Sequence, residues 1–148
     1  FSMSCEVLGK IPSATLLFAG LINATDRDRR ELSLDDNVAN VLSIKRIRYC
    51  DGEPVMVEDT HFSTEYSYLL TNNLEGSLYE LLNKHDIVPS VGRTELDVCY
   101  ATDEEAELLD IESNTPLLLL RCACYDKTGN SIHNSRQVVN PKKFKMII

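Results

Sequence analysis

Apolar residues recur with two different periods along this chain, and the two periods indicate a domain that mixes strands with helices. Stretches in which apolar and polar residues alternate, or in which β-branched and aromatic residues gather, predict strands. These stretches are residues 13–25, 44–50, 54–62, 94–100, 116–126, 131–139 and 142–148. Short connections join the last three, which predicts an antiparallel meander in the C-terminal half.

Helix signals fall between the predicted strands. Leu34, Val38 and Leu42 are four residues apart, the spacing of one helix face. Two more helices open on a capping box, in which a hydroxyl residue stands three positions before a glutamate. The boxes are Ser77 with Glu80 and Thr102 with Glu105. Without a repeat or a linker, the pattern predicts a single α+β domain over residues 1–148, with a mostly antiparallel β-sheet flanked by helices.

The hairpin between the second and third predicted strands carries the best signal for ligand binding. Arg46 and Arg48 precede a turn signal at residues 51–52, and both project from one face of their strand. Such a pair can hold a phosphate or a carboxylate. A tight two-residue loop sets Arg46 opposite Val57, whereas a longer loop or a bulge sets it opposite Glu58. The pattern leaves both registers open, and an exposed surface ion pair is the alternative to a binding site.

The charge balance argues against DNA binding by this segment alone. The sequence holds 15 Lys and Arg against 23 Asp and Glu, for a net charge of −8, which repels a phosphate backbone. The chain begins at Phe1 rather than at a methionine. We therefore expect a segment of a longer protein, with part of the function outside it.

Cysteine usage and the absence of catalytic motifs narrow the function further. Five cysteines, odd in number and never spaced as CxxC, favour a reducing cytoplasm and buried unpaired thiols over a disulfide framework or a zinc site. No apolar run reaches the length of a membrane helix, and no charged n-region precedes a signal core in this sequence. The histidines are isolated, and phosphate-loop and nucleophile motifs are missing. We expect a cytoplasmic protein without catalytic residues, metal or cofactor.

Three segments, taken in order, carry a family resemblance. They are RIRYCDGEPVMVEDTHF, LEGSLYELLNKHDI and ATDEEAELLDIESNTPLLLLRCACYDKTGNSI. Together they resemble the UTRA effector-binding domain of GntR-type transcriptional regulators of the HutC subfamily. The resemblance implies a chorismate-lyase-like fold that binds a small effector and forms a homodimer. It also implies that an N-terminal winged helix-turn-helix domain, absent from this sequence, contacts the DNA.

The same resemblance implies the residues of an effector pocket. They are Arg46, Arg48, Glu58, Ser77, Arg93 and His133. The arginines and Ser77 are expected to meet an anionic group, with a sugar phosphate as the leading effector class, and Glu58 is expected to share a face with Arg46. His133 stands where the family often has a glutamate, so a different contact to the ligand is expected there. Replacing Arg46 by alanine is expected to weaken binding and to leave the fold intact.

Two other functions stay open at this point. The chorismate-lyase-like fold also suits a lyase acting on an aromatic carboxylate. A dimerisation module without a ligand is the other alternative, and in that case Arg46 and Arg48 lie on a solvated edge.

Overall fold

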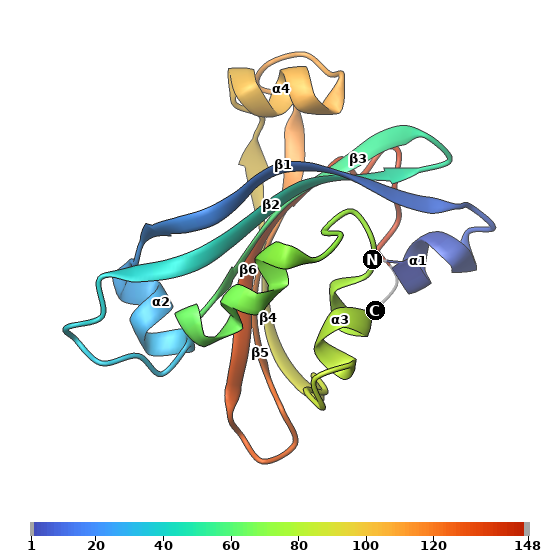
Figure 1. The fold of residues 1–148 in the computed structure, drawn as a ribbon. Helices are drawn as coiled ribbons and strands as arrows, with labels where there is room; N and C mark the ends of the chain where they lie inside the picture. Colours follow the sequence, from blue (N-terminus) through green and yellow to red (C-terminus); the bar gives the residue numbers. More distant parts are fainter. Residues whose placement is uncertain (1, 147–148) are drawn as a thin grey trace.

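Six antiparallel strands form one sheet in the computed structural model, which describes residues 2–146 (Figure 1). In spatial order they are β1 (Pro12–Asn23), β2 (Asn40–Cys50), β3 (Glu53–Phe62), β6 (Ser131–Val139), β5 (Pro116–Tyr125) and β4 (Val91–Tyr100). Strands β1 to β3 form one meander and β4 to β6 another, and the two meet where β3 pairs with β6. The predicted α+β fold with an antiparallel sheet is confirmed.

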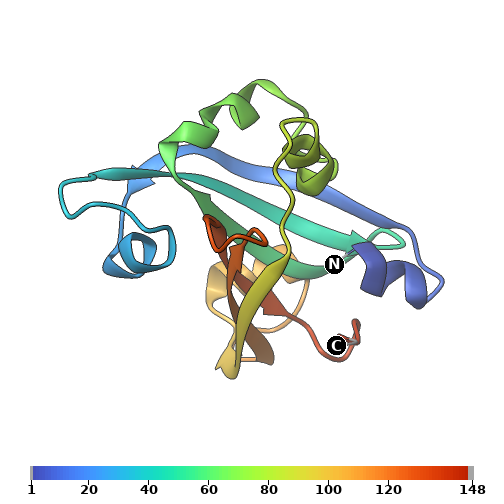
Figure 2. The same ribbon diagram turned by 90° about the horizontal axis from the view of Figure 1, so that it is seen from below.

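Helices cover both faces of this sheet (Figure 2). They are α1 (Ser2–Val7), α2 (Asp26–Glu31), the 3-10 helix η1 (Thr64–Thr71), α3 (Leu78–Asn83) and α4 (Asp103–Leu109). Helices η1 and α3 pack on one face, where Leu69 and Leu82 meet Phe62 in a buried apolar cluster. Helix α4 packs on the opposite face, where Leu109 meets Val138. Strand β3 contributes to both of these cores, with Phe62 in the first and Val57 in the second, because alternate strand residues point to opposite faces.

The predicted capping boxes form to different degrees. At α4 the box is complete, because Thr102 and Glu105 each accept a hydrogen bond from the backbone N–H of the other. At α3 the Ser77 hydroxyl accepts from the backbone N–H of Glu80 at 3.3 Å, whereas the described contacts include no return bond to the Glu80 side chain. Both helices begin where the sequence predicted.

The helix predicted from Leu34, Val38 and Leu42 is wrong. A capping box between Thr25 and Asp28 starts α2 earlier, and the helix ends at Glu31. Ser33 then adopts a left-handed φ of 54°, which breaks the helical path before Leu34. Leu42 lies in β2 and is fully buried, so its apolar character belongs to a strand face and not to a helix face.

The strand predicted at residues 142–148 is also wrong over its described part, residues 142–146, which form a turn and irregular backbone. Asn140 causes the turn, because its side chain accepts from the Lys142 N–H and its carbonyl accepts from the N–H groups of Lys143 and Phe144. Phe144 is 2% exposed and packs in an apolar cluster with Met56. Residues 147–148 lie outside the described chain.

The cysteines differ from expectation at one place. Cys5 of α1 and Cys50 of β2, which are 45 residues apart in sequence, form a disulfide, whereas we expected unpaired thiols. Cys99, Cys122 and Cys124 are free. Within residues 2–146 we find no group of side chains suited to a metal ion, and no helical segment whose length and apolar character would let it cross a membrane.

Candidate functional site

The register of the β2–β3 hairpin puts Arg46 opposite Glu58. Asp51 and Gly52 both adopt positive φ, 51° and 79°, as in the tight primed turns that suit hairpins. The first pairs after the turn follow the register of a two-residue loop. Val55 then has no partner on β2, so this bulge shifts the pairing by one residue and brings Glu58 onto the face of Arg46.

A cavity of about 350 Å³ lies on this face of the sheet. Strands β2, β3 and β6 supply most of its wall, and the start of α3 supplies the rest. The lining residues are Arg46, Arg48, Glu58, Thr60, Phe62, Ser77, Leu78, Tyr79, His133, Ser135 and Gln137. The structure thus brings together all the pocket residues predicted from sequence except Arg93.

A buried ionic group occupies one end of the cavity. Glu58 Oε1 accepts from Arg46 Nη2 at 2.8 Å and from Arg48 Nη1 at 3.3 Å, and Gln137 donates to Glu58 Oε2 at 2.9 Å. Arg46, Arg48 and Glu58 are 3%, 8% and 6% exposed. Burial alone would raise the pKa of Glu58, but the two arginines outweigh it and hold this pKa below its ordinary value. The carboxylate is therefore ionised.

Arg46 also ties the sheet to the loop that leads into α3. Its Nη1 donates to the carbonyl oxygens of Leu74 at 3.3 Å and Gly76 at 2.9 Å. Ser77, the next residue, caps α3 and lines the cavity. Arg46 therefore has a structural role that sequence reasoning missed, since nothing in the local pattern indicates that residues 74–76 fold back over β2.

The other end of the cavity is uncharged. His133 is 6% exposed, and its Nε2 lies 3.4 Å from the Tyr79 hydroxyl, while its buried Nδ1 has no hydrogen-bond partner among the described residues. Burial lowers the pKa of His133 to about 4 against the opposing pull of Glu58, so its imidazole is neutral near pH 7. The Phe62 ring packs 5.5 Å from the imidazole.

Arg93 lies on the opposite face of the sheet. It pairs with Ala123, which pairs with Asn134, and Asn134 and the cavity residue His133 are neighbours on β6 that point to opposite faces. The Arg93 side chain is 78% exposed and lies 3.2 Å from Glu95. It lines a separate open hollow between α2 and the strands β4 and β5. The expected anion contact from Arg93 to the cavity is therefore absent from this arrangement.

Three polar residues of the cavity were missed from sequence. Thr60 follows Glu58 on the same face of β3, and Ser135 and Gln137 follow His133 on the same face of β6. The signal that could have found them is the two-residue period, because polar side chains that recur on a buried strand face need polar surroundings. Thr60 and Ser135 are each 4% exposed.

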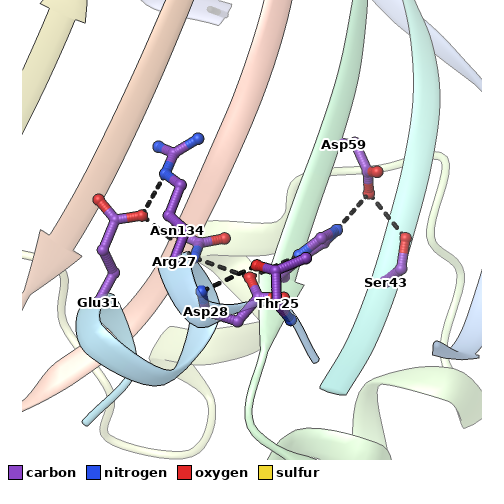
Figure 3. Close-up of polar contacts among 8 residues, drawn as sticks. Thr25, Arg27, Asp28, Glu31, Ser43, Asp59 and Asn134 are labelled. Carbon is purple, nitrogen blue, oxygen red and sulfur yellow. Dashed lines mark hydrogen bonds and ion pairs between the residues drawn. The ribbon is translucent and has the colours of Figure 1, made fainter. Parts of the chain in front are cut away.

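A second buried polar cluster fastens α2 to the face opposite the cavity (Figure 3). His61 Nδ1 lies 2.8 Å from Asp28 Oδ1, His61 Nε2 lies 3.2 Å from Asp59 Oδ1, and Asn134 donates to Asp28 at 3.0 Å. Ser43 completes the cluster by donating to Asp59 at 2.7 Å. Burial alone would lower the pKa of His61, but the two carboxylates raise it to about 9. This protonated histidine stabilises the position of α2.

The fold and the cavity together define an α+β domain with a buried pair of arginines facing a space the size of a small metabolite. The UTRA domain model matches residues 8–145, so the chain belongs to the UTRA domain family. This confirms the resemblance found in the sequence.

Two named relatives are similar to this chain over most of its length. The HTH-type transcriptional repressor NagR of Bacillus subtilis (strain 168) is 24% identical over 149 residues, covering 99% of this chain and 61% of that protein. The HTH-type transcriptional regulator YurK of the same organism is 26% identical over 138 residues, covering 91% of this chain and 57% of that protein. The chain thus spans about three fifths of the length of these curated relatives.

The effector domain of PhnF from Mycobacterium smegmatis has the same fold. It superposes with a TM-score of 0.90 at 23% identity, covering 99% of this chain and 91% of that chain. At this identity the likeness concerns the fold, and it confirms the expected chorismate-lyase-like architecture.

Proposed function

We propose that this chain is the effector-sensing domain of a GntR-type transcriptional regulator of the HutC subfamily, and that its cavity binds an anionic metabolite, with a sugar phosphate as the leading class. The observation that carries the proposal is the pair of buried arginines, Arg46 and Arg48, which line the cavity together with Glu58. Two buried guanidinium groups that face a cavity suit an anion, because they can hold it by charge-assisted hydrogen bonds.

The contacts of Arg46 suggest how binding is transmitted. An anion that draws on the guanidinium competes with Glu58 and with the carbonyl groups of Leu74 and Gly76. The loop before α3 would then rest differently on the sheet with and without ligand. The ligand shifts the balance between these arrangements only by the difference in its affinity for them.

The rest of the regulator is proposed from the relatives. Both curated relatives are named HTH-type regulators, and this chain matches about three fifths of each. We propose a cytoplasmic homodimer in which residues 1–148 sense the effector and a winged helix-turn-helix domain outside this sequence contacts DNA. Strand β4 supports dimerisation, because it is an edge strand with Leu96, Val98 and Tyr100 each more than half exposed.

A pair of matched cap variants tests ligand binding. Ser77→Ala and Thr102→Ala each remove an N-cap hydroxyl, and each is expected to cost about 1 kcal/mol of stability. Only Ser77 lines the cavity. Calorimetric titration with phosphorylated sugars and inorganic phosphate should therefore show weaker binding by Ser77→Ala and unchanged binding by Thr102→Ala.

Two outcomes would count against the proposal. If no anionic metabolite at about 100 times a plausible Kd raises the unfolding free energy by about 2.7 kcal/mol, the sensor function is wrong and dimerisation alone stands. If a bound aromatic carboxylate is turned over to product, the domain is a lyase. Equal loss of binding in the two cap variants would remove Ser77 from the site.

A further inference from the structure

The two ends of the cavity differ in charge and are well separated. Glu58 pairs with Gln137 across β3 and β6, and Phe62 pairs with His133. Four residues of β6 separate these two rows, which is about 13 Å of strand. The arginines lie at the Glu58 row, whereas His133 and Tyr79 meet at the other. A ligand whose anionic group lies at the arginines thus presents its remaining groups to His133 and Tyr79.

Within residues 2–146, the lining of the cavity offers no spare negative charge for a ligand cation. Glu58 is the one carboxylate among these lining residues, and both its oxygens are engaged, Oε1 by the two arginines and Oε2 by Gln137. The remaining titratable lining groups are Tyr79 and His133. With its pKa lowered to about 4, the histidine is a neutral imidazole at physiological pH.

His133 nevertheless offers a hydrogen bond. His133 is 6% exposed, and its buried Nδ1 has no hydrogen-bond partner among residues 2–146. Buried polar atoms of this kind normally form a hydrogen bond. A neutral imidazole donates through one nitrogen and accepts through the other, and its tautomer adapts to the group it meets. A hydroxyl or an amide carbonyl can use such a site without bringing charge into it.

We infer that the effector carries a neutral hydrogen-bonding group, a hydroxyl or an amide, at the end that meets His133 and Tyr79, and that the cavity rejects otherwise identical ligands with an ammonium group there. The inference rests on the proposed function and narrows its ligand class. An ammonium would lose its hydration without gaining a counter-charge from the described residues at this end. His133 is thus the residue that determines specificity at this end.

Matched ligand pairs test the inference. The probes are glucose 6-phosphate against glucosamine 6-phosphate, and ethylene glycol phosphate against ethanolamine phosphate, with inorganic phosphate as the reference. Calorimetry at about pH 6.5 keeps the amines protonated. For each ligand pair that the protein binds, we expect the affinity for the neutral ligand to be at least about tenfold higher than that for the amine.

Two variants of equal shape assign the effect to His133. His133→Gln keeps a neutral hydrogen-bonding side chain and should keep the preference for the neutral ligand. His133→Glu differs from it by a charge, supplies the missing counter-ion and should reverse the preference. If His133→Glu fails to fold, the ¹⁵N imidazole signals of the wild-type chain provide the second measurement, since the Nδ1 signal of His133 should shift with the neutral ligand.

The outcomes separate this inference from the proposed function. Equal or tighter binding of the amines by the wild-type chain overturns the inference and leaves the anion sensor standing. Binding of inorganic phosphate without binding of any neutral member overturns the assignment of the His133 end. Failure of every phosphate, inorganic phosphate included, overturns the proposed function, and the inference falls with it.

Discussion

Replacing Arg46 by alanine should destabilise the fold, contrary to what the sequence suggested. The substitution leaves the carboxylate of Glu58, 6% exposed, without its shortest ion-pair contact, and it removes the donors to the carbonyl groups of Leu74 and Gly76. Removing one partner of a buried ion pair costs about 3–5 kcal/mol, because the other charge stays buried. A loss of this size is a large part of the stability of a domain of this length.

Urea unfolding followed by far-ultraviolet circular dichroism measures this cost. Arg93→Ala is the matched control, since Arg93 is 78% exposed and its ion pair with Glu95 lies at the surface, where a loss within about 0.5 kcal/mol is expected. The single variant Glu58→Gln and the double variant Arg46→Ala with Glu58→Gln complete a mutant cycle. The double variant should be more stable than the sum of the two single losses predicts, because no carboxylate is left buried without Arg46. A loss below about 1 kcal/mol in Arg46→Ala would refute the buried-pair reasoning.

Two further predictions concern the cluster under α2 and the hairpin turn. The pKa of His61 is raised to about 9, so its contribution to stability is fully present below about pH 6.5 and is lost as the pH rises through 9. The pKa of Asp28 is lowered, so its contribution is lost as the pH falls below about 4. His61→Gln should flatten the alkaline limb of a plot of urea midpoint against pH, and an unchanged limb would exclude this assignment. Gly52→Ala, at a φ of 79°, should cost about 1 kcal/mol in thermal unfolding, whereas no loss would mean that the turn is not left-handed there.

The strands were predictable because their residues obey a local rule. In β2 and β3 the gathering of β-branched and aromatic residues that favours strands is visible in a few residues, and so is the turn at Asp51 and Gly52. The register between them was not predictable, because it depends on the bulge at Val55. Packing on both faces of the complete sheet decides whether a strand contains a β-bulge, and the sequence of a single strand does not reveal this packing.

The errors in the helices and at the C-terminus have a related cause. Leu34, Val38 and Leu42 matched a helical period, but a cap at Thr25 and a left-handed Ser33 determine where α2 begins and ends. Likewise, the side chain of Asn140 turns the backbone away from the sheet. Single hydrogen bonds of this kind compete with the periodic signal and outweigh it at the ends of elements.

Some residues of the candidate site are brought together by local sequence and others by long-range strand pairing. Arg46, Arg48 and Glu58 are close because one hairpin carries them, although the bulge at Val55 decides that Glu58 shares their face. His133 reaches them because β6 pairs with β3, a long-range contact that periodicity does not specify. Arg93 was misplaced for that reason, since a strand assignment without the sheet order does not tell which face a residue shares with the arginines.

The contacts of Arg46 link the stability of the domain to its proposed sensing role. A guanidinium held only by the sheet could bind an anion without moving anything else. Arg46 is instead divided between Glu58 on β3 and the carbonyl groups of Leu74 and Gly76 beside Ser77, so an anion that takes the Nη donors of these bonds weakens one of these attachments. The contact of Arg46 with Glu58 joins two charged groups, and Glu58 is also held in place by Arg48 and Gln137. The contacts of Arg46 with the two neutral carbonyl groups are therefore the weaker ones. Ligand binding should therefore loosen residues 74–76 before it disturbs the sheet, and faster amide exchange in that loop on addition of ligand is the observation that follows.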